Sequence, residues 1–303
     1  MILYLYGSNS YAINNQLSLI LQKYLDKNKD EGDFVKYDMS ETPASSLISD
    51  LAVMPMFASS RLIYAENIGR AKLSADQIKH IINITPESTN LVLTDISPDK
   101  RTTSFKELKK LPGAKEFPLL SDDALVRWVM AEAINNKAKI DISTSRFLVE
   151  YVGKDQWTLH NEIAKLSCFE PIINRESIIK LASPSIDSTT FAMAEALVKK
   201  DYKKALKIYD ELKLYGNADQ LIQGSVIYQY RTIMLALIND QELIRAYKVS
   251  PYPMQKARGL AGSMSLDDIK RAYQVIAKAD LATKSGELPA EEAMREMIYQ
   301  LCN

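Results

Sequence analysis

The chain has 303 residues, 47% hydrophobic and 25% charged, which is ordinary for a folded globular protein of two or three domains. Its 38 basic and 38 acidic residues balance overall and in each part defined below, so no part has the basic excess of a stand-alone nucleic-acid-binding protein. Two cysteines and two histidines disfavour a disulfide framework and a structural zinc site.

The first 120 residues alternate short apolar runs with amphipathic segments. The N-terminal run, Met1 to Gly7, has no basic residues of the kind that open a signal peptide, and it is too short for a signal peptide or a membrane span. We therefore expect a cytoplasmic protein without membrane contact. We expect strands at 2–6, 34–38, 61–65 and 90–95, and helices at 12–27, 45–53 and 75–84. This alternation predicts a mostly parallel sheet covered by helices.

After Pro118 the strand pattern stops. Ser121-Asp122-Asp123 can cap a helix at 124–135, and three further helices are expected at 143–152, 157–169 and 175–181. A break at 183–188 precedes helices at 189–200, 202–214, 218–238, 240–248, 253–260, 265–284 and 289–301. The predicted fold class is therefore α/β plus all-α, with domains at 1–120, 121–183 and 184–303.

The turn after the first strand is where a phosphate-binding loop would lie. Such a loop needs a second glycine and a lysine, because backbone amides wrap the phosphates and the lysine reaches them. The loop here begins with Gly7, Ser8 and Asn9 and has neither residue. We interpret it as a degenerate phosphate loop that serves as a turn, with residual nucleotide binding as the alternative.

Asp95, at the end of the fourth predicted strand, is the other candidate for nucleotide chemistry. An acidic residue at that position holds magnesium in phosphoryl-transfer ATPases. Here the next residue is Ile96 and no phosphate loop accompanies it, which favours a non-catalytic role. No Ser-His-Asp, Cys-His or His-Glu-x-x-His arrangement is visible either, so we expect no catalytic residues, no metal and no cofactor.

The most unusual segment is Met54-Pro55-Met56-Phe57-Ala58-Ser59-Ser60-Arg61. Pro55 ends the preceding helix, so Met56 and Phe57 lie on a short connection before a strand. They either fold back into the core of their own domain or form an exposed apolar plug for a partner, since methionine and aromatic residues are enriched at interface centres. Periodicity does not separate these interpretations.

Several of these segments resemble the delta subunit of bacterial DNA polymerase III, a clamp-loader family. The resemblance is carried, in order along the chain, by Tyr4-Leu5-Tyr6-Gly7, residues 54–63, 99–101, 106–110 and 116–118, Gly153-Lys154-Asp155 with Leu159, Asn161-Glu162 and Lys165-Leu166, Pro251-Tyr252 with Lys256-Ala257, and 279–286. Met56 departs from the family pattern, in which leucine is commoner, but methionine is an apolar substitute of similar size.

The resemblance implies an AAA+-like first domain, a helical lid and a helical collar. It implies a protein that opens the sliding clamp without hydrolysing ATP, and a clamp-binding element made of Met56, Phe57, Ser60 and Arg61. Its implied partners are the beta clamp, the gamma/tau motor subunits and delta-prime in one ring, and primer–template DNA within that complex.

Three other functions stay open at this point. A delta-prime-like or other AAA+ adaptor is one, although delta-prime relatives carry zinc-binding cysteines and a Ser-Arg-Cys motif that this sequence lacks. An atypical ATPase and a stand-alone DNA-binding protein are the others. The incomplete phosphate loop disfavours an ATPase, and the balanced charge disfavours a stand-alone DNA-binding protein.

Overall fold

The computed structural model of the chain describes residues 1–28, 32–53, 60–247, 249 and 251–303. It divides into two compact units, Met1–Leu125 and Val126–Asn303. The unit boundary falls inside the predicted lid range of 121–183, and the rest of that range and the predicted collar lie in the second unit. The predicted domain boundaries near residues 120 and 183 stay predictions. The predicted class, an α/β part followed by an all-α part, is confirmed.

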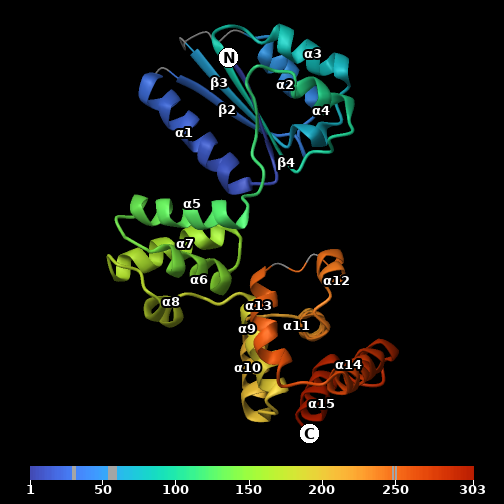
Figure 1. Cartoon of the computed structure of the whole chain (residues 1–303). Helices are drawn as coiled ribbons and strands as arrows, with labels where there is room; N and C mark the ends of the chain where they lie inside the picture. The colour runs from blue at the N-terminus through green and yellow to red at the C-terminus, as the bar shows by residue number, and fades with distance from the viewer. Residues whose placement is uncertain (29–31, 54–59, 248, 250) are drawn as a thin grey trace. The chain divides into compact units, whose positions relative to one another are not determined.

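The first unit is built around a five-stranded parallel sheet with the strand order β2-β3-β4-β1-β5. Figure 1 shows α1 on one face of this sheet and α2, α3 and α4 on the other. In chain order the elements are β1 (Ile2–Gly7), α1 (Ser10–Asn28), β2 (Gly32–Asp38), α2 (Ala44–Leu51), β3 (Ser60–Glu66), the 3-10 turn η2 (Ile68–Ala71), α3 (Ala75–Ile84), β4 (Thr89–Ile96), α4 (Thr103–Leu108) and β5 (Ala114–Glu116).

The central strands are apolar on both faces because helices cover both sides. Successive side chains of a strand point to opposite faces, so Tyr4 packs toward α2, α3 and α4 while Leu5 packs toward α1. The same alternation places Ile63 in the first of these cores and Leu62 in the second. The continuous apolar runs that predicted buried parallel strands thus correspond to two cores, one on each face.

The described residues after β5 form helices and one isolated bridge, between Lys139 and Ile172, but no strand. The first of these helices is α5 (Asp122–Asn135), which begins in the first unit and continues into the second. It is followed by α6 (Ile142–Val152), α7 (Gln156–Phe169) and α8 (Arg175–Leu181). Asp141 and Asp155 cap α6 and α7 by accepting a hydrogen bond from a backbone N–H three residues on. His160 Nδ1 lies 2.7 Å from Glu132 Oε1 and so joins α7 to α5.

The remaining helices form one large apolar core. They are α9 (Ile186–Val198), α10 (Tyr202–Leu214), α11 (Asp219–Ile238), α12 (Gln241–Ala246), α13 (Pro251–Ala261), α14 (Leu266–Ser285) and α15 (Ala290–Cys302). The helix α11 packs against α9, α13 and α14, and it buries Ile222, Val226 and Ile233 completely. These helices span residues 186–302, within the range 184–303 predicted as the collar, and we keep that name for them.

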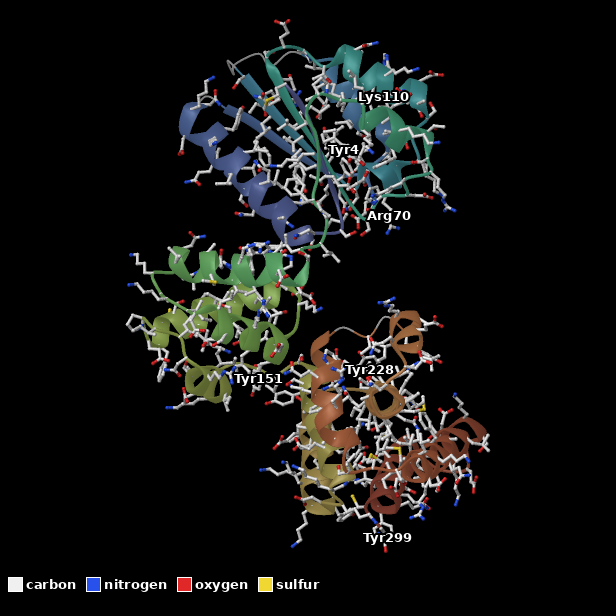
Figure 2. All side chains as sticks on the ribbon, viewed as in Figure 1. Tyr4, Arg70, Lys110, Tyr151, Tyr228 and Tyr299 are labelled. Carbon is white, nitrogen blue, oxygen red and sulfur yellow. The ribbon has the colours of Figure 1, made fainter. Side chains whose placement is uncertain are left out.

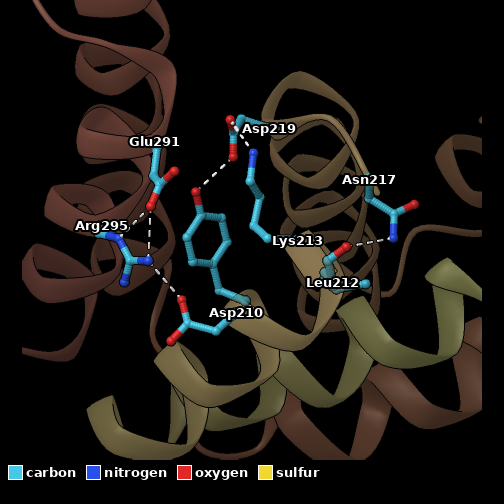
Figure 3. Close-up of polar contacts among 8 residues, drawn as sticks. Asp210, Leu212, Lys213, Asn217, Asp219, Glu291 and Arg295 are labelled. Carbon is cyan, nitrogen blue, oxygen red and sulfur yellow. Dashed lines mark hydrogen bonds and ion pairs between the residues drawn. The ribbon is translucent and has the colours of Figure 1, made fainter. Parts of the chain in front are cut away.

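A polar network ties α10 to α11 and α15 within the collar (Figure 3). The Tyr209 hydroxyl donates to Asp219 at 2.7 Å, and Lys213 Nζ lies 2.8 Å from the other carboxylate oxygen. Arg295 Nη2 donates to Asp210 Oδ1 at 2.8 Å. Burial raises the pKa of Asp219, but the hydrogen bonds from Lys213 and Tyr209 outweigh it and hold that pKa below its usual value.

Candidate functional site

The described part of the predicted site lies where β2 and β3 begin. Arg61 is 9% exposed, and its guanidinium reaches two acidic residues. Nε lies 2.8 Å from Asp33 Oδ2 and Nη2 lies 3.5 Å from Asp50 Oδ2, while Nη1 donates to the Asp50 carbonyl at 2.8 Å. One side chain thus joins the start of β2, the end of α2 and the start of β3.

Ser60 belongs to the same arrangement. The Tyr24 hydroxyl lies 2.8 Å from the Ser60 carbonyl oxygen and 3.1 Å from the Asp33 carbonyl oxygen, and the Ser60 hydroxyl donates to Asn28 at 2.7 Å. We call Arg61, Ser60, Asp33, Asp50 and Tyr24 the Arg61 network. It includes Ser60 and Arg61, two of the four residues predicted to bind the clamp. Met56 and Phe57 lie outside the described residues.

The loop interpreted as a degenerate phosphate loop, which begins at Gly7, contacts the residues that follow β5. Gly7 has a φ of 137°, and a β-carbon placed on it would lie 2.2 Å from the Phe117 carbonyl oxygen. Asn9 N–H donates to that same oxygen at 3.0 Å, and Asn9 Nδ2 donates to the Pro118 carbonyl at 3.3 Å. Asn9 also caps α1 by accepting from the Ala12 N–H at 3.0 Å.

This packing has a chemical consequence. Phosphate loops bind anions with free backbone N–H groups in an open turn. Here the Asn9 N–H donates to the Phe117 carbonyl oxygen instead, and this oxygen carries a negative partial charge beside the loop. Gly7 and Asn9 therefore serve the packing of residues 117–118 against the loop.

Asp95, the other residue tested for nucleotide chemistry, is buried between the sheet and η2. Its two carboxylate oxygens accept from the Gly69 N–H at 2.9 and 3.0 Å, and Oδ2 also accepts from the Tyr4 hydroxyl at 3.0 Å. Tyr4 itself lies inside the first unit (Figure 2). Burial raises the pKa of Asp95, only partly offset by these hydrogen bonds. The carboxyl group is thus engaged in holding η2 to β1 and β4.

We expect Asp95→Asn to be at least as stable as the wild type at pH 7. Its amide can accept from Gly69 and donate to the Tyr4 oxygen without burying a charge. A carboxyl pKa raised by folding adds stability below the unfolded value of about 4, and that stability is lost as pH rises through the folded pKa. The advantage of the variant should therefore shrink as pH falls toward about 4.

Urea unfolding of the full chain at several pH values measures this advantage. Asp95→Ala is the comparison, because it leaves the Gly69 N–H and the Tyr4 hydroxyl without a partner and should cost about 1–3 kcal/mol. An Asp95→Asn protein as unstable as Asp95→Ala would contradict this assignment.

A metal centre and a membrane-spanning helix are both absent from the described ranges. No group of three or more His, Cys, Asp or Glu side chains there could hold a metal ion. None of the helices in those ranges is long and apolar enough to cross a bilayer.

The sequence did not predict three short elements or the acidic partners of Arg61. The elements η2, α4 and β5 have four, six and three residues, too short for a periodic pattern. Asp33 and Asp50 are 28 and 11 positions from Arg61 in the sequence, so no local motif signals their pairing. A parallel register that sets Asp33 opposite Arg61 is the structural cause of the contact.

Comparison with known proteins identifies the family. The family model of the DNA polymerase III delta subunit matches residues 3–141, and a second model, for the C-terminal domain of the same family, matches residues 187–301. DNA polymerase III subunit delta of Bacillus subtilis is 21% identical over 319 residues, which cover 98% of this chain and 91% of that protein. A probable DNA polymerase III subunit delta of Aquifex aeolicus is 21% identical over 227 residues, covering 70% and 63%.

A solved structure shares the fold. The Bacillus subtilis DNA clamp loader delta protein aligns with a TM-score of 0.61 at 20% identity, over 99% of this chain and 95% of that one. The two family matches lie in the same order as the sheet-bearing unit and the collar, and they confirm the resemblance carried by the sequence motifs. The chain therefore belongs to the delta-subunit family of DNA polymerase III, the clamp-loader component of DNA replication.

Proposed function

We propose that this chain binds and opens the sliding clamp as the non-hydrolysing member of a cytoplasmic clamp-loader ring. The observation that carries the proposal is the closed phosphate loop, in which the Phe117 carbonyl accepts from Asn9 N–H beside Gly7. A clamp-loader protein whose phosphate loop is closed in this way would act through binding rather than catalysis. In this ring its partners are gamma/tau motor subunits, delta-prime and primer–template DNA.

Met56 and Phe57 are the proposed clamp contact. They lie between α2, whose last turn includes Asp50, and β3, which begins at Ser60. The Arg61 guanidinium binds both of these elements, so we assign Arg61 and Ser60 the role of fixing the two ends between which the apolar pair lies in the sequence. Burying each large apolar side chain in a clamp pocket contributes about 1.5–3 kcal/mol.

Opening follows if the apolar pair binds the open clamp more tightly than the closed one. A ligand shifts a conformational equilibrium only by its difference in affinity for the two states. ATP bound by the motor subunits would then control loading by exposing or covering this surface. An atypical ATPase would instead need a phosphate loop free to accept nucleotide, and tight binding of a fluorescent ATP analogue by the isolated chain would favour it.

The test is calorimetric binding of the full chain to the sliding clamp of the same organism. We expect Met56→Ala/Phe57→Ala to lose at least about 3 kcal/mol of binding free energy, which is more than 100-fold in Kd. Leu214→Ala/Tyr215→Ala is the matched control, because it removes an adjacent apolar pair that is 86% and 74% exposed in the collar. This control should bind like the wild type.

The outcomes separate the function from its site. Loss of binding in a well-folded Met56→Ala/Phe57→Ala protein supports both. Equal binding by all three proteins would place the clamp contact elsewhere, and no binding by the wild type would count against clamp binding itself.

A further inference from the structure

A groove on the surface of the first unit lies between α3 and α4. It has a volume of about 590 Å³ and is lined by Ala75, Thr103, Lys106, Glu107, Lys109 and Lys110. Phe105 and Leu108 are buried in the core on the opposite side of α4, so the lysines are exposed to solvent. Lys110 is labelled at the surface in Figure 2. We call this feature the lysine groove.

The charge of the lysine groove is not neutralised from within. Lys110 Nζ lies 2.7 Å from Glu107, so these two groups offset each other. Lys106 and Lys109 are exposed and form no ion pair within the described ranges. Two ammonium groups, of Lys106 on α4 and of Lys109 at its C-cap, therefore face solvent at the groove, although the first 120 residues together carry no net charge.

We propose that the lysine groove binds the phosphate backbone of DNA. Lysine ammonium groups are point charges that contact phosphates without reading sequence. No aromatic side chain lines the groove, so bases have no surface on which to stack. An acidic peptide would need apolar anchors beside its charges, and Ala75 is the only apolar residue in the lining.

This assignment rests on the proposed contact with primer–template DNA and is independent of clamp binding by Met56 and Phe57. Because Lys106 and Lys109 act through charge, their contribution should fall as salt rises and should not depend on DNA sequence.

The experiment uses the clamp loader reconstituted with the full chain and a fluorescently labelled primed DNA as the probe. Removing two phosphate contacts with Lys106→Ala/Lys109→Ala should weaken binding about 3- to 10-fold near 0.1 M salt and lower the slope of log K against log salt by about 1–2. Lys23→Ala/Lys27→Ala, which removes two exposed lysines from α1, is the control of equal charge change and should leave both values unchanged.

Each outcome decides the assignment. A loss specific to the α4 variant, at unchanged thermal stability and unchanged clamp binding, supports it. An unchanged salt slope overturns it, as does an equal loss in both lysine variants. Binding of polyglutamate that competes with DNA only when Lys106 and Lys109 are present would also overturn it, in favour of an acidic protein partner. Failure of the wild-type chain to bind the clamp would contradict the proposed function and leave this comparison intact.

Discussion

Gly7→Ala is expected to destabilise the chain by on the order of 3–5 kcal/mol. Two effects add. A φ of 137° is a backbone conformation that an L side chain adopts at a cost of about 1–3 kcal/mol, and the added methyl group would lie 2.2 Å from the Phe117 carbonyl oxygen. Relieving that overlap moves residues 117–118 away and breaks the Asn9–Phe117 hydrogen bond at 3.0 Å.

Urea unfolding of the full chain, observed with a spectroscopic probe attached to the first unit, measures this loss of stability. Gly224→Ala is the matched control, because that glycine lies in α11 with no neighbouring atom within 4 Å of the added methyl group. Alanine in a helix is favoured over glycine by about 0.5–1 kcal/mol, so the control should be slightly stabilised. Equal effects of the two substitutions would contradict the packing of Phe117 against the loop.

Arg61→Ala has the second largest expected effect on stability, a loss of about 2–4 kcal/mol. The side chain is 10% exposed, and its removal takes one donor each from Asp33, the Asp50 carboxylate and the Asp50 carbonyl. Asp50 keeps the Tyr37 hydroxyl and the Val53 N–H as donors, so the main loss falls on Asp33. The carboxylates of Asp33 and Asp50 are 37% and 39% exposed, so water compensates in part, which keeps the loss below that of a fully buried pair.

Arg101→Ala is the control for this substitution. Arg101 pairs with Asp99 at 2.9 Å but is 91% exposed, and exposed pairs contribute about 0–1 kcal/mol. Arg61→Lys tests geometry, because it keeps the charge but cannot reach three acceptors with a planar fork. If Arg61→Ala proved no less stable than Arg101→Ala, the Arg61 network would not hold the strands together.

The same Arg61 variants connect stability with function. If the guanidinium orients the segment that carries Met56 and Phe57, Arg61→Lys should weaken clamp binding more than it weakens the fold. Clamp binding that follows stability alone would assign Arg61 a purely structural role.

The sequence by itself determined the local elements and the family. Apolar runs such as Leu91-Val92-Leu93 require cover on both faces, so the four longer strands and the parallel sheet were predictable, as were most of the helices. The ordered motifs, ending with residues 279–286, were enough for the delta-subunit resemblance that the family matches confirm. The sequence predicts these features because each strand, helix or motif depends on residues that lie close together in the chain.

Only the tertiary structure decided how distant residues combine. Three contacts join residues that lie far apart in the chain. Phe117 packs against Gly7, Arg61 pairs with Asp33 and Asp50, and Asp95 accepts hydrogen bonds from Gly69 and Tyr4. Hydrophobic periodicity records which face of an element is buried, but not which partner it meets. Steric fit and charge pairing depend on strand order and register, and these are set by the packing of the whole unit.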